Sequence, residues 1–342
     1  MEEEKQVMEG AATAARRRLV IGVGFWVQGF RLFPWLGVNF FLKDGMGVAA
    51  SSLQILQASA NLPMVAKPLI GLLSDAVPIR GHRRLPYVAI GALLQAISWL
   101  AIALWQDISL QVLTIFLLLS NFGASICEVA NDAIVAESGK KAASSSGSAS
   151  YAAIPFLLGT MFFYQTEVLR LDSSVIGLSK VFGQVALLAW SMSYNKYFKT
   201  MSARKLLSVL QFVTALVMLS DVLFVQGVYR KVGIPDSIYT IVFSGLLEGL
   251  MFFKVLPFSV HVAKLCPAGC EGSVMAFVMS ALALATIVSG YLGVALAAFM
   301  GVSGDDFSAL PACLLIEAAC TMLPLCCSSL IKERREKEKK QE

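Results

Sequence analysis

Two apolar segments of membrane-spanning length lie near the start of the chain, and a short basic loop follows the second. The stretch from Phe25 to Arg84 contains both segments and ends in Gly81-His82-Arg83-Arg84. An apolar run of about 20 residues crosses the hydrocarbon core of a bilayer as a helix. The pattern therefore predicts an all-α polytopic membrane protein of the transporter type.

The composition agrees with an integral membrane protein. Hydrophobic residues make up 57% of the chain and charged residues 15%, against roughly half and a quarter in soluble domains. This leaves too little polar surface to cover a water-soluble globule of this size. The formal net charge of +5 does not indicate nucleic-acid binding, because the basic residues sit in alternate loops between the apolar segments.

Ten apolar segments are long enough to be membrane-spanning helices. They are predicted at 19–42, 52–75, 87–105, 110–135, 150–168, 175–194, 206–228, 238–261, 273–300 and 310–331. Of the 28 Lys and Arg residues, 20 fall in segments on one side of this arrangement, four on the other, and four within or at the edge of helices. Because cytoplasmic loops carry the excess of Lys and Arg, both termini are predicted to be cytosolic.

Four sequence motifs stand out at the ends and in the middle of the chain. They are Phe40-Phe41-Leu42-Lys43-Asp44, Leu62-Pro63 with Lys67-Pro68-Leu69 through Arg84, Glu128 through Glu137, and Lys264-Leu265-Cys266-Pro267 through Met279. These motifs resemble those of the folate-biopterin transporter family, which is similar to the major facilitator superfamily. The resemblance implies a major facilitator-like helix bundle and secondary transport of folates or related pterins by alternating access. A proton is the candidate coupling ion.

A major facilitator-like fold is usually built from two six-helix halves, so ten helices leave two unaccounted for. The resemblance stops at Glu137 and resumes at Tyr151, in a segment similar to the start of a seventh helix. We therefore expect a shortened form that lacks helices five and six and most of the central cytosolic loop. The predicted organisation is a cytosolic tail at 1–18, a first bundle of four helices at 19–137, a linker with the junction at 138–150, a second bundle of six helices at 151–331, and a cytosolic tail at 332–342.

The amino terminus begins Met1-Glu2-Glu3-Glu4 and is acidic, whereas transit peptides are rich in Ser and Arg and poor in acidic residues. A cleavable plastid transit peptide is therefore not expected. The sequence leaves open which membrane holds the protein.

The chain carries no signature of a bound cofactor. Its seven cysteines lack the spacing of a metal site, and it contains no Walker sequence. No nucleophile, base and orienting group occur together in a recognisable motif, so a membrane-embedded enzyme is the poorer interpretation. We expect no metal, no cofactor and no enzymatic activity.

Ionisable residues inside the predicted helices are the candidates for substrate binding. Each costs roughly 2.5 to 3.5 kcal/mol at a helix centre, so such residues face a bundle interior or a water-filled cavity. Arg31 lies in the middle of helix one, and Lys67 lies in the middle of helix two beside Pro68. Folates carry a glutamate tail, and Arg and Lys bind carboxylates, so both are predicted substrate contacts. The alternative is that each pairs with an acidic neighbour for structural reasons.

Helix four carries two carboxylates on one face, because Glu128 and Asp132 are four residues apart. One can accept hydrogen bonds from the amino group and ring nitrogen of a pterin, and one can carry a proton. Both are predicted to contact substrate, and Asp132 is also a candidate for ion coupling. The alternative places Asp132 and Glu137 against Arg83 and Arg84 in a conformational latch.

The loop after helix two is the second candidate for a latch. The resemblance to the facilitator superfamily implies a charge relay between the Asp that ends this helix and the basic residues after it, which holds one access state. The sequence does not name the partner of that Asp. The predicted gating residues are Asp75, Arg80, Arg83, Arg84 and Glu137.

Five ionisable residues of the second half lie in apolar surroundings, namely Asp221, Glu248, Lys254, His261 and Glu317. Glu248 stands between Gly245 and Gly249, small residues that let helices approach closely. Glu248 and Lys254 are predicted to line the substrate cavity. Asp221 is a candidate for ion coupling, or for satisfying a neighbour's polar group.

Two other functions stay open at this point. The shortened chain could be inactive in transport and act as a membrane partner or regulator of a full-length carrier. It could also carry another small organic anion, because fold-level analogy says little about which substrate a carrier takes.

Overall fold

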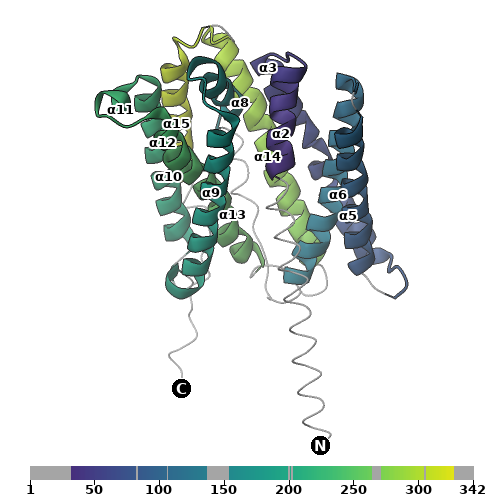
Figure 1. Ribbon diagram of the computed structural model, residues 1–342. Coiled ribbons are helices and arrows are strands. Elements are labelled where there is room, and N and C mark those ends of the chain that lie inside the picture. Colours follow the sequence, from purple (N-terminus) through teal and green to yellow (C-terminus); the bar gives the residue numbers. More distant parts are fainter. Residues whose placement is uncertain are drawn as a thin grey trace, which may run out of the picture.

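The computed structural model describes residues 32–81, 84–105, 107–136, 154–198, 201, 203–263, 271–303 and 306–326, and the regular structure of these residues is helical. Figure 1 shows the helices α5 and α6 on one side, the helices α10 to α12 on the other, and α14 running between them. The predicted site residues Arg31, Arg83 and Glu137 and the linker at 138–150 lie outside the described residues.

The first group of helices extends to residue 136. Its elements are α2 (Leu32–Phe40), the π-helical turn η1 (Phe41–Gly45), α3 (Ala50–Ala60), the 3-10 turn η2 (Leu62–Ala66), α4 (Lys67–Ala76), α5 (Leu85–Leu104) and α6 (Leu110–Ala136).

The second group begins after the linker. Its elements are α8 (Leu158–Phe163), η3 (Tyr164–Val168), α9 (Ser173–Ser193), η4 (Tyr194–Phe198), α10 (Ala203–Val225), α11 (Val228–Lys231), α12 (Asp236–Tyr239), η5 (Thr240–Ser244), α13 (Gly245–Ala263), α14 (Glu271–Phe299) and α15 (Leu310–Cys326).

The helices have the length and the surface of a multi-pass membrane protein. Six of them are long and apolar enough to cross a bilayer among the residues that the structure describes. Large apolar side chains face outward on these helices, for example Leu104 at 71% and Leu188 at 62% exposure. Soluble proteins rarely expose such surfaces, so the fold is an all-α polytopic membrane fold. The predicted number of ten spans stays a prediction.

The second predicted helix, 52–75, is not continuous. α3 ends at Ala60, and α4 begins at Lys67 after the 3-10 turn η2. Pro63 and Pro68 favour this break, because a proline has no N–H for the helical bond to the residue four positions earlier. The expectation of one unbroken helix is therefore corrected: Lys67 opens a new helix instead of sitting in the middle of one.

Neighbouring helices satisfy the backbone groups that the break releases. Asn121 of α6 donates from its side-chain amide to the carbonyl of Ala60 at 2.7 Å. Ser280 of α14 donates from its hydroxyl to the carbonyl of Val65 at 2.6 Å. Irregular backbone inside a membrane protein is tolerated where other protein groups supply such bonds.

α14 belongs to the second bundle by sequence but lies against helices of the first. The side-chain amide of Gln54 on α3 donates to the carbonyl of Gly290 on α14 at 3.0 Å and to the carbonyl of Phe156, just before α8, at 2.8 Å. Ser280 adds the bond to the break in helix two. α14 and the start of α8 therefore join the two groups of helices.

Glycines permit close packing within each group. A methyl group on Gly91 of α5 would lie 2.5 Å from the carbonyl oxygen of Gly123 on α6. A methyl group on Gly245 of α13 would lie 2.6 Å from the carbonyl oxygen of Ser179 on α9. Both distances are shorter than van der Waals contact, so only glycine fits at these crossings.

Candidate substrate site and gates

Lys67 and two carboxylates of α6 form a charged cluster in the first group of helices. Lys67 Nζ lies 2.6 Å from a carboxylate oxygen of Glu128. The Lys67 side chain is 8% exposed and that of Glu128 is 20% exposed. The charges of Lys67 and Glu128 act on Asp132, which is one turn further along α6. The structure thus brings together three of the predicted substrate residues.

The cluster continues a polar stripe along α6 that sequence reasoning missed. Asn121 donates to the carbonyl of Ala60 at the break in helix two, and Ser125 donates to the sulfur of Met64 in η2 at 3.1 Å. The positions 121, 125, 128 and 132 recur every three or four residues and so share one face of a helix. This spacing in the sequence could have predicted the polar stripe.

Glu248 and Lys254, the predicted substrate residues of the second group of helices, lie in two separate polar contacts. Glu248 of α13 pairs with Lys180 of α9 at 2.5 Å. Lys254 donates to the side-chain oxygen of Gln211 at 3.2 Å, and Gln211 donates to the carbonyl of Thr321 at 2.6 Å. Sequence reasoning placed Lys180 within a helix but assigned it no role.

Asp221 lies in a buried contact with Tyr239. The hydroxyl of Tyr239 donates to Asp221 at 3.0 Å and lies 2.6 Å from the hydroxyl of Ser220. Glu317 of α15 is buried and within electrostatic range of Asp221. The hydrogen bond from Tyr239 is the polar contact that the second interpretation of Asp221 expects, and ion coupling by Asp221 stays a prediction.

Asp75, near the end of α4, has the partners that the sequence could not name. Arg84 binds one carboxylate oxygen of Asp75 at 2.6 Å and the hydroxyl of Ser74 at 2.8 Å. Ser273, in the first turn of α14, donates to the other carboxylate oxygen of Asp75 at 2.6 Å. Arg80 is exposed in the turn with a backbone φ of 51°.

The alternative pairing of helix four with the basic loop stays a prediction, because Arg83 and Glu137 lie outside the described residues. Among the described residues, Arg84 binds Asp75, and the charges of Lys67 and Glu128 act on Asp132. The latch therefore joins α4 to α14, which carries residues of the second half of the chain. Sequence reasoning missed Ser273 as a partner of Asp75, because a serine hydroxyl is uncharged and common in helices.

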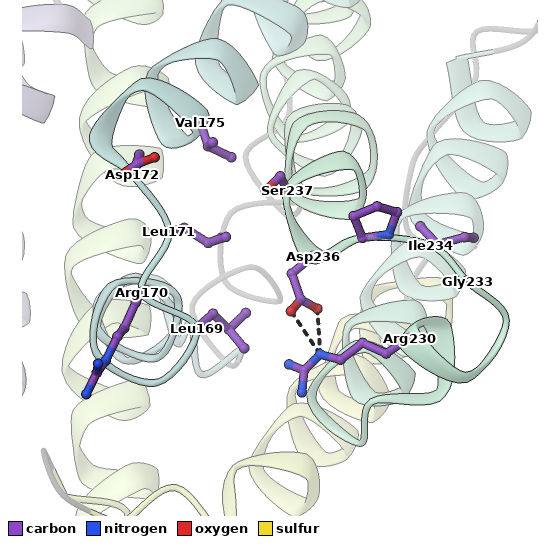
Figure 2. Close-up of a pocket in the computed structure, with 11 residues that line it drawn as sticks. Leu169, Arg170, Leu171, Asp172, Val175, Arg230, Gly233, Ile234, Asp236 and Ser237 are labelled. Atoms are coloured by element: carbon purple, nitrogen blue, oxygen red, sulfur yellow. Dashed lines mark hydrogen bonds and ion pairs between the residues drawn. The ribbon is translucent and has the colours of Figure 1, made fainter.

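A surface pocket of about 500 Å³ opens near α11 and the start of α9. In Figure 2, Arg230 points toward Asp236, and their closest atoms are 2.7 Å apart, while Arg170 points away from this pair. Of the predicted substrate residues that the structure describes, none lines the pocket. We therefore do not assign the substrate site to it.

The BT1 family model matches two segments of the sequence, 28–152 and 149–342. The chain belongs to the BT1 family. This BT1 protein is 45% identical to probable folate-biopterin transporter 7 of Arabidopsis thaliana, over 94% of this chain and 95% of the relative. Probable folate-biopterin transporter 8, chloroplastic, of the same plant is 35% identical over 92% of this chain and 75% of the relative. The folate-biopterin transporter of Synechocystis sp. is 23% identical over 94% and 82%.

The family resemblance that the motifs predicted is confirmed, and the shortened form fits the same comparisons. The two matched segments of this BT1 protein overlap at 149–152, at the end of the linker 138–150 in which the junction is predicted. The alignment with the first relative has 421 positions, and this chain has 342 residues. At least 79 of those positions, 421 less 342, therefore have no counterpart in this chain.

Proposed function

We propose that this chain is a secondary transporter of folates or related pterins that works by alternating access and is coupled to protons. The names of its relatives support the substrate class. The observation that carries the site assignment is the partly buried pair of Lys67 and Glu128, whose charges act on Asp132. A transporter needs no catalytic residue, so we propose no enzymatic activity.

The charged cluster offers the two kinds of group that a folate requires. The ammonium of Lys67 can exchange Glu128 for a carboxylate of the glutamate tail. Glu128 and Asp132 can then accept hydrogen bonds from the amino group and ring nitrogen of the pterin. We include Arg31, Glu248 and Lys254 as further substrate contacts from the sequence.

Proton coupling follows from the same exchange. When a substrate carboxylate takes Lys67, the two carboxylates of α6 lose their positive neighbour while they remain one helical turn apart. A proton on one of them removes the repulsion between like charges. Asp132 is our first candidate for this proton, and Asp221 is the second.

The Asp75 latch is the proposed gate at one end of the bundle. Asp75 accepts hydrogen bonds from Arg84 in the first group of helices and from Ser273 on α14. Release of the bond from Ser273 would let α14 move away from α4. We place this end and both termini in the cytosol, from the distribution of Lys and Arg. The membrane that holds the protein is left open, as one relative is named chloroplastic.

The test is uptake of labelled folic acid and labelled biopterin, with and without a proton gradient, by folate-transport-deficient cells that express this chain. Lys67→Gln is expected to abolish saturable uptake of folic acid. Lys231→Gln is the matched control, because Lys231 is an exposed lysine on α11. Normal uptake by Lys67→Gln at equal surface expression would exclude Lys67 as a substrate contact.

A form with two further helices restored at the junction separates function from truncation. Transport by both forms supports the proposal for this chain. Transport by the restored form alone would make this product an inactive membrane partner. Uptake of a different organic anion by both forms would correct the substrate class.

A further inference from the structure

Two segments of the chain, one in each group of helices, share the same unusual backbone. Both contain a π-helical turn, η1 at Phe41–Gly45 and η3 at Tyr164–Val168. Both then contain a residue with positive φ, Gly47 at 63° and Arg170 at 50°. Helices follow at Ala50 and Ser173, so each feature recurs after 123 residues.

This repeat is a property of the fold and not of the side chains. Positive φ is uncommon for a residue other than glycine, yet Arg170 adopts it at the position where the first repeat has Gly47. π-helical turns are rare in general, but η4 and η5 of this chain are π-helical as well, so what η1 and η3 share is the turn together with the positive φ and the helix that follow at the same spacing. Two such turns at equivalent positions indicate that both segments serve one purpose at the same end of the bundle.

The repeat places a lysine between two equivalent carboxylates. Asp44 and Glu167 occupy matching positions, since they too are 123 residues apart. Lys43 Nζ lies 2.8 Å from Asp44 and 2.6 Å from Glu167. The position that matches Lys43 in the second repeat is Thr166, so one cation serves both acids.

The surroundings hold the lysine in place but leave the carboxylates open to solvent. The Lys43 side chain is 9% exposed, whereas those of Asp44 and Glu167 are 60% and 50% exposed. Lys43 Nζ also lies 5.9 Å from the ring centre of Phe163, within the range of a cation–π contact. Beside the ion pair, Phe40 and Phe162 meet edge to face with ring centres 5.3 Å apart.

Lys43 keeps its charge at neutral pH. Burial disfavours the ammonium, but hydrogen bonds to Asp44 and Glu167 and the charges of both outweigh it and raise the pKa of Lys43 above its ordinary value of 10.5. A raised folded-state pKa stabilises the folded protein below the unfolded value and loses this effect only as the pH rises through the folded value. The ammonium that makes the contact is therefore present at physiological pH.

We propose that Lys43, Asp44 and Glu167 form a clamp that holds the ends of the two repeats together and must open for substrate to pass this end. By the predicted topology, Lys43 follows helix one on the outward side and Asp75 ends helix two on the cytosolic side, so the clamp and the Asp75 latch close opposite ends. This role of the clamp rests on the proposed function. Because the carboxylates of Asp44 and Glu167 are open to solvent, their ion pairs with Lys43 contribute little to stability, so the clamp closes this end without locking it.

Hydrogen–deuterium exchange of the protein in lipid nanodiscs at neutral pH tests the clamp without measuring transport. Lys43→Met and Glu167→Gln are expected to speed amide exchange in 41–48 and 164–171 by about fivefold, as loss of a contact of this strength predicts. The double variant that exchanges the pair, Lys43→Glu with Glu167→Lys, is expected to restore slow exchange, because opposite charges then face each other again with their positions reversed.

Asp172→Asn is the matched control, since Asp172 is an exposed carboxylate of the same end for which the described residues show no ion pair. Unchanged exchange in both single variants, an equal change in the control, or no restoration in the exchanged pair would overturn the clamp. If exchange behaves as expected while no form of the chain takes up folic acid or biopterin, the clamp stands and the proposed function fails.

Discussion

Lys67 Nζ lies 2.6 Å from a carboxylate oxygen of Glu128, although 61 residues separate the two in the sequence. The contact forms because Pro63 and Pro68 flank a break that makes Lys67 the first residue of α4, opposite the polar stripe of α6. The same prolines that interrupt the helix therefore position the charge.

Removal of Lys67 alone is expected to destabilise the protein more than removal of the pair. Loss of one partner of a fully buried ion pair costs about 3–5 kcal/mol, and we expect a smaller cost here because the Glu128 side chain is 20% exposed. Lys67→Met should therefore lower the thermal unfolding temperature in detergent, and Lys67→Met/Glu128→Leu should recover most of the loss. Equal unfolding temperatures for the single and double variants would contradict a buried pair.

The crossing of α9 and α13 is expected to tolerate no side chain at Gly245. A methyl group there would lie 2.6 Å from the carbonyl oxygen of Ser179, and overpacking costs typically about 1–3 kcal/mol. Gly245→Ala should lower the thermal unfolding temperature of the purified protein. Gly177→Ala on α9 is the control, because its methyl group would meet Leu36 at an ordinary 3.8 Å. A loss of the same size in both variants would show that the crossing is not the cause.

Ser280→Ala should weaken the break in helix two. The substitution leaves the carbonyl of Val65 without the hydroxyl that lies 2.6 Å away, and an unsatisfied buried group costs about 1–3 kcal/mol. Amide exchange in 61–68 is the measurement, with faster exchange expected. The control is Thr286→Ala, since Thr286 lies on the same helix, is exposed and bonds to its own helix at Leu282. Equal exchange in the two variants would refute the role of Ser280.

Ser273→Ala should loosen the Asp75 latch while leaving Arg84 bound. The hydroxyl of Ser273 is the described contact that carries the latch across to α14, and a hydrogen bond to a charged group contributes about 1.5–3 kcal/mol. We expect faster amide exchange in the first turns of α14 and a changed rate of folic acid uptake. Asp75→Asn, which weakens both contacts of Asp75, should produce the larger change. A larger effect of Ser273→Ala than of Asp75→Asn would be inconsistent with the latch.

The sequence predicted those features that depend on local pattern. Apolar length predicted the membrane fold, and the glycines around Glu248 predicted a close helix crossing, which the structure places at Gly245 and Ser179. The motifs predicted the family. The spacing of Glu128 and Asp132 placed them on one face, where Lys67 meets them.

Contacts between distant segments could not be predicted in the same way. The bond from Ser273 to Asp75 spans 198 residues, and no single-sequence pattern links a serine to a carboxylate so far away. Asn121 and Ser125 were overlooked because neutral polar residues are common in helices. The pairing of Lys43 with Glu167 depends on a repeat that is visible in backbone angles and not in residue identity.

The break in helix two also affects how the protein is made. α3 has 11 residues and α4 has 10, and each is about half of what crosses a bilayer. The carbonyl of Val65 meets Ser280 only after 215 further residues have been synthesised. Until then the nascent chain holds a membrane segment in which the Val65 carbonyl lacks this hydrogen-bond partner, and an unsatisfied backbone group is costly in lipid. Substitutions at the break should therefore reduce the yield of inserted protein during synthesis, before any substrate is encountered.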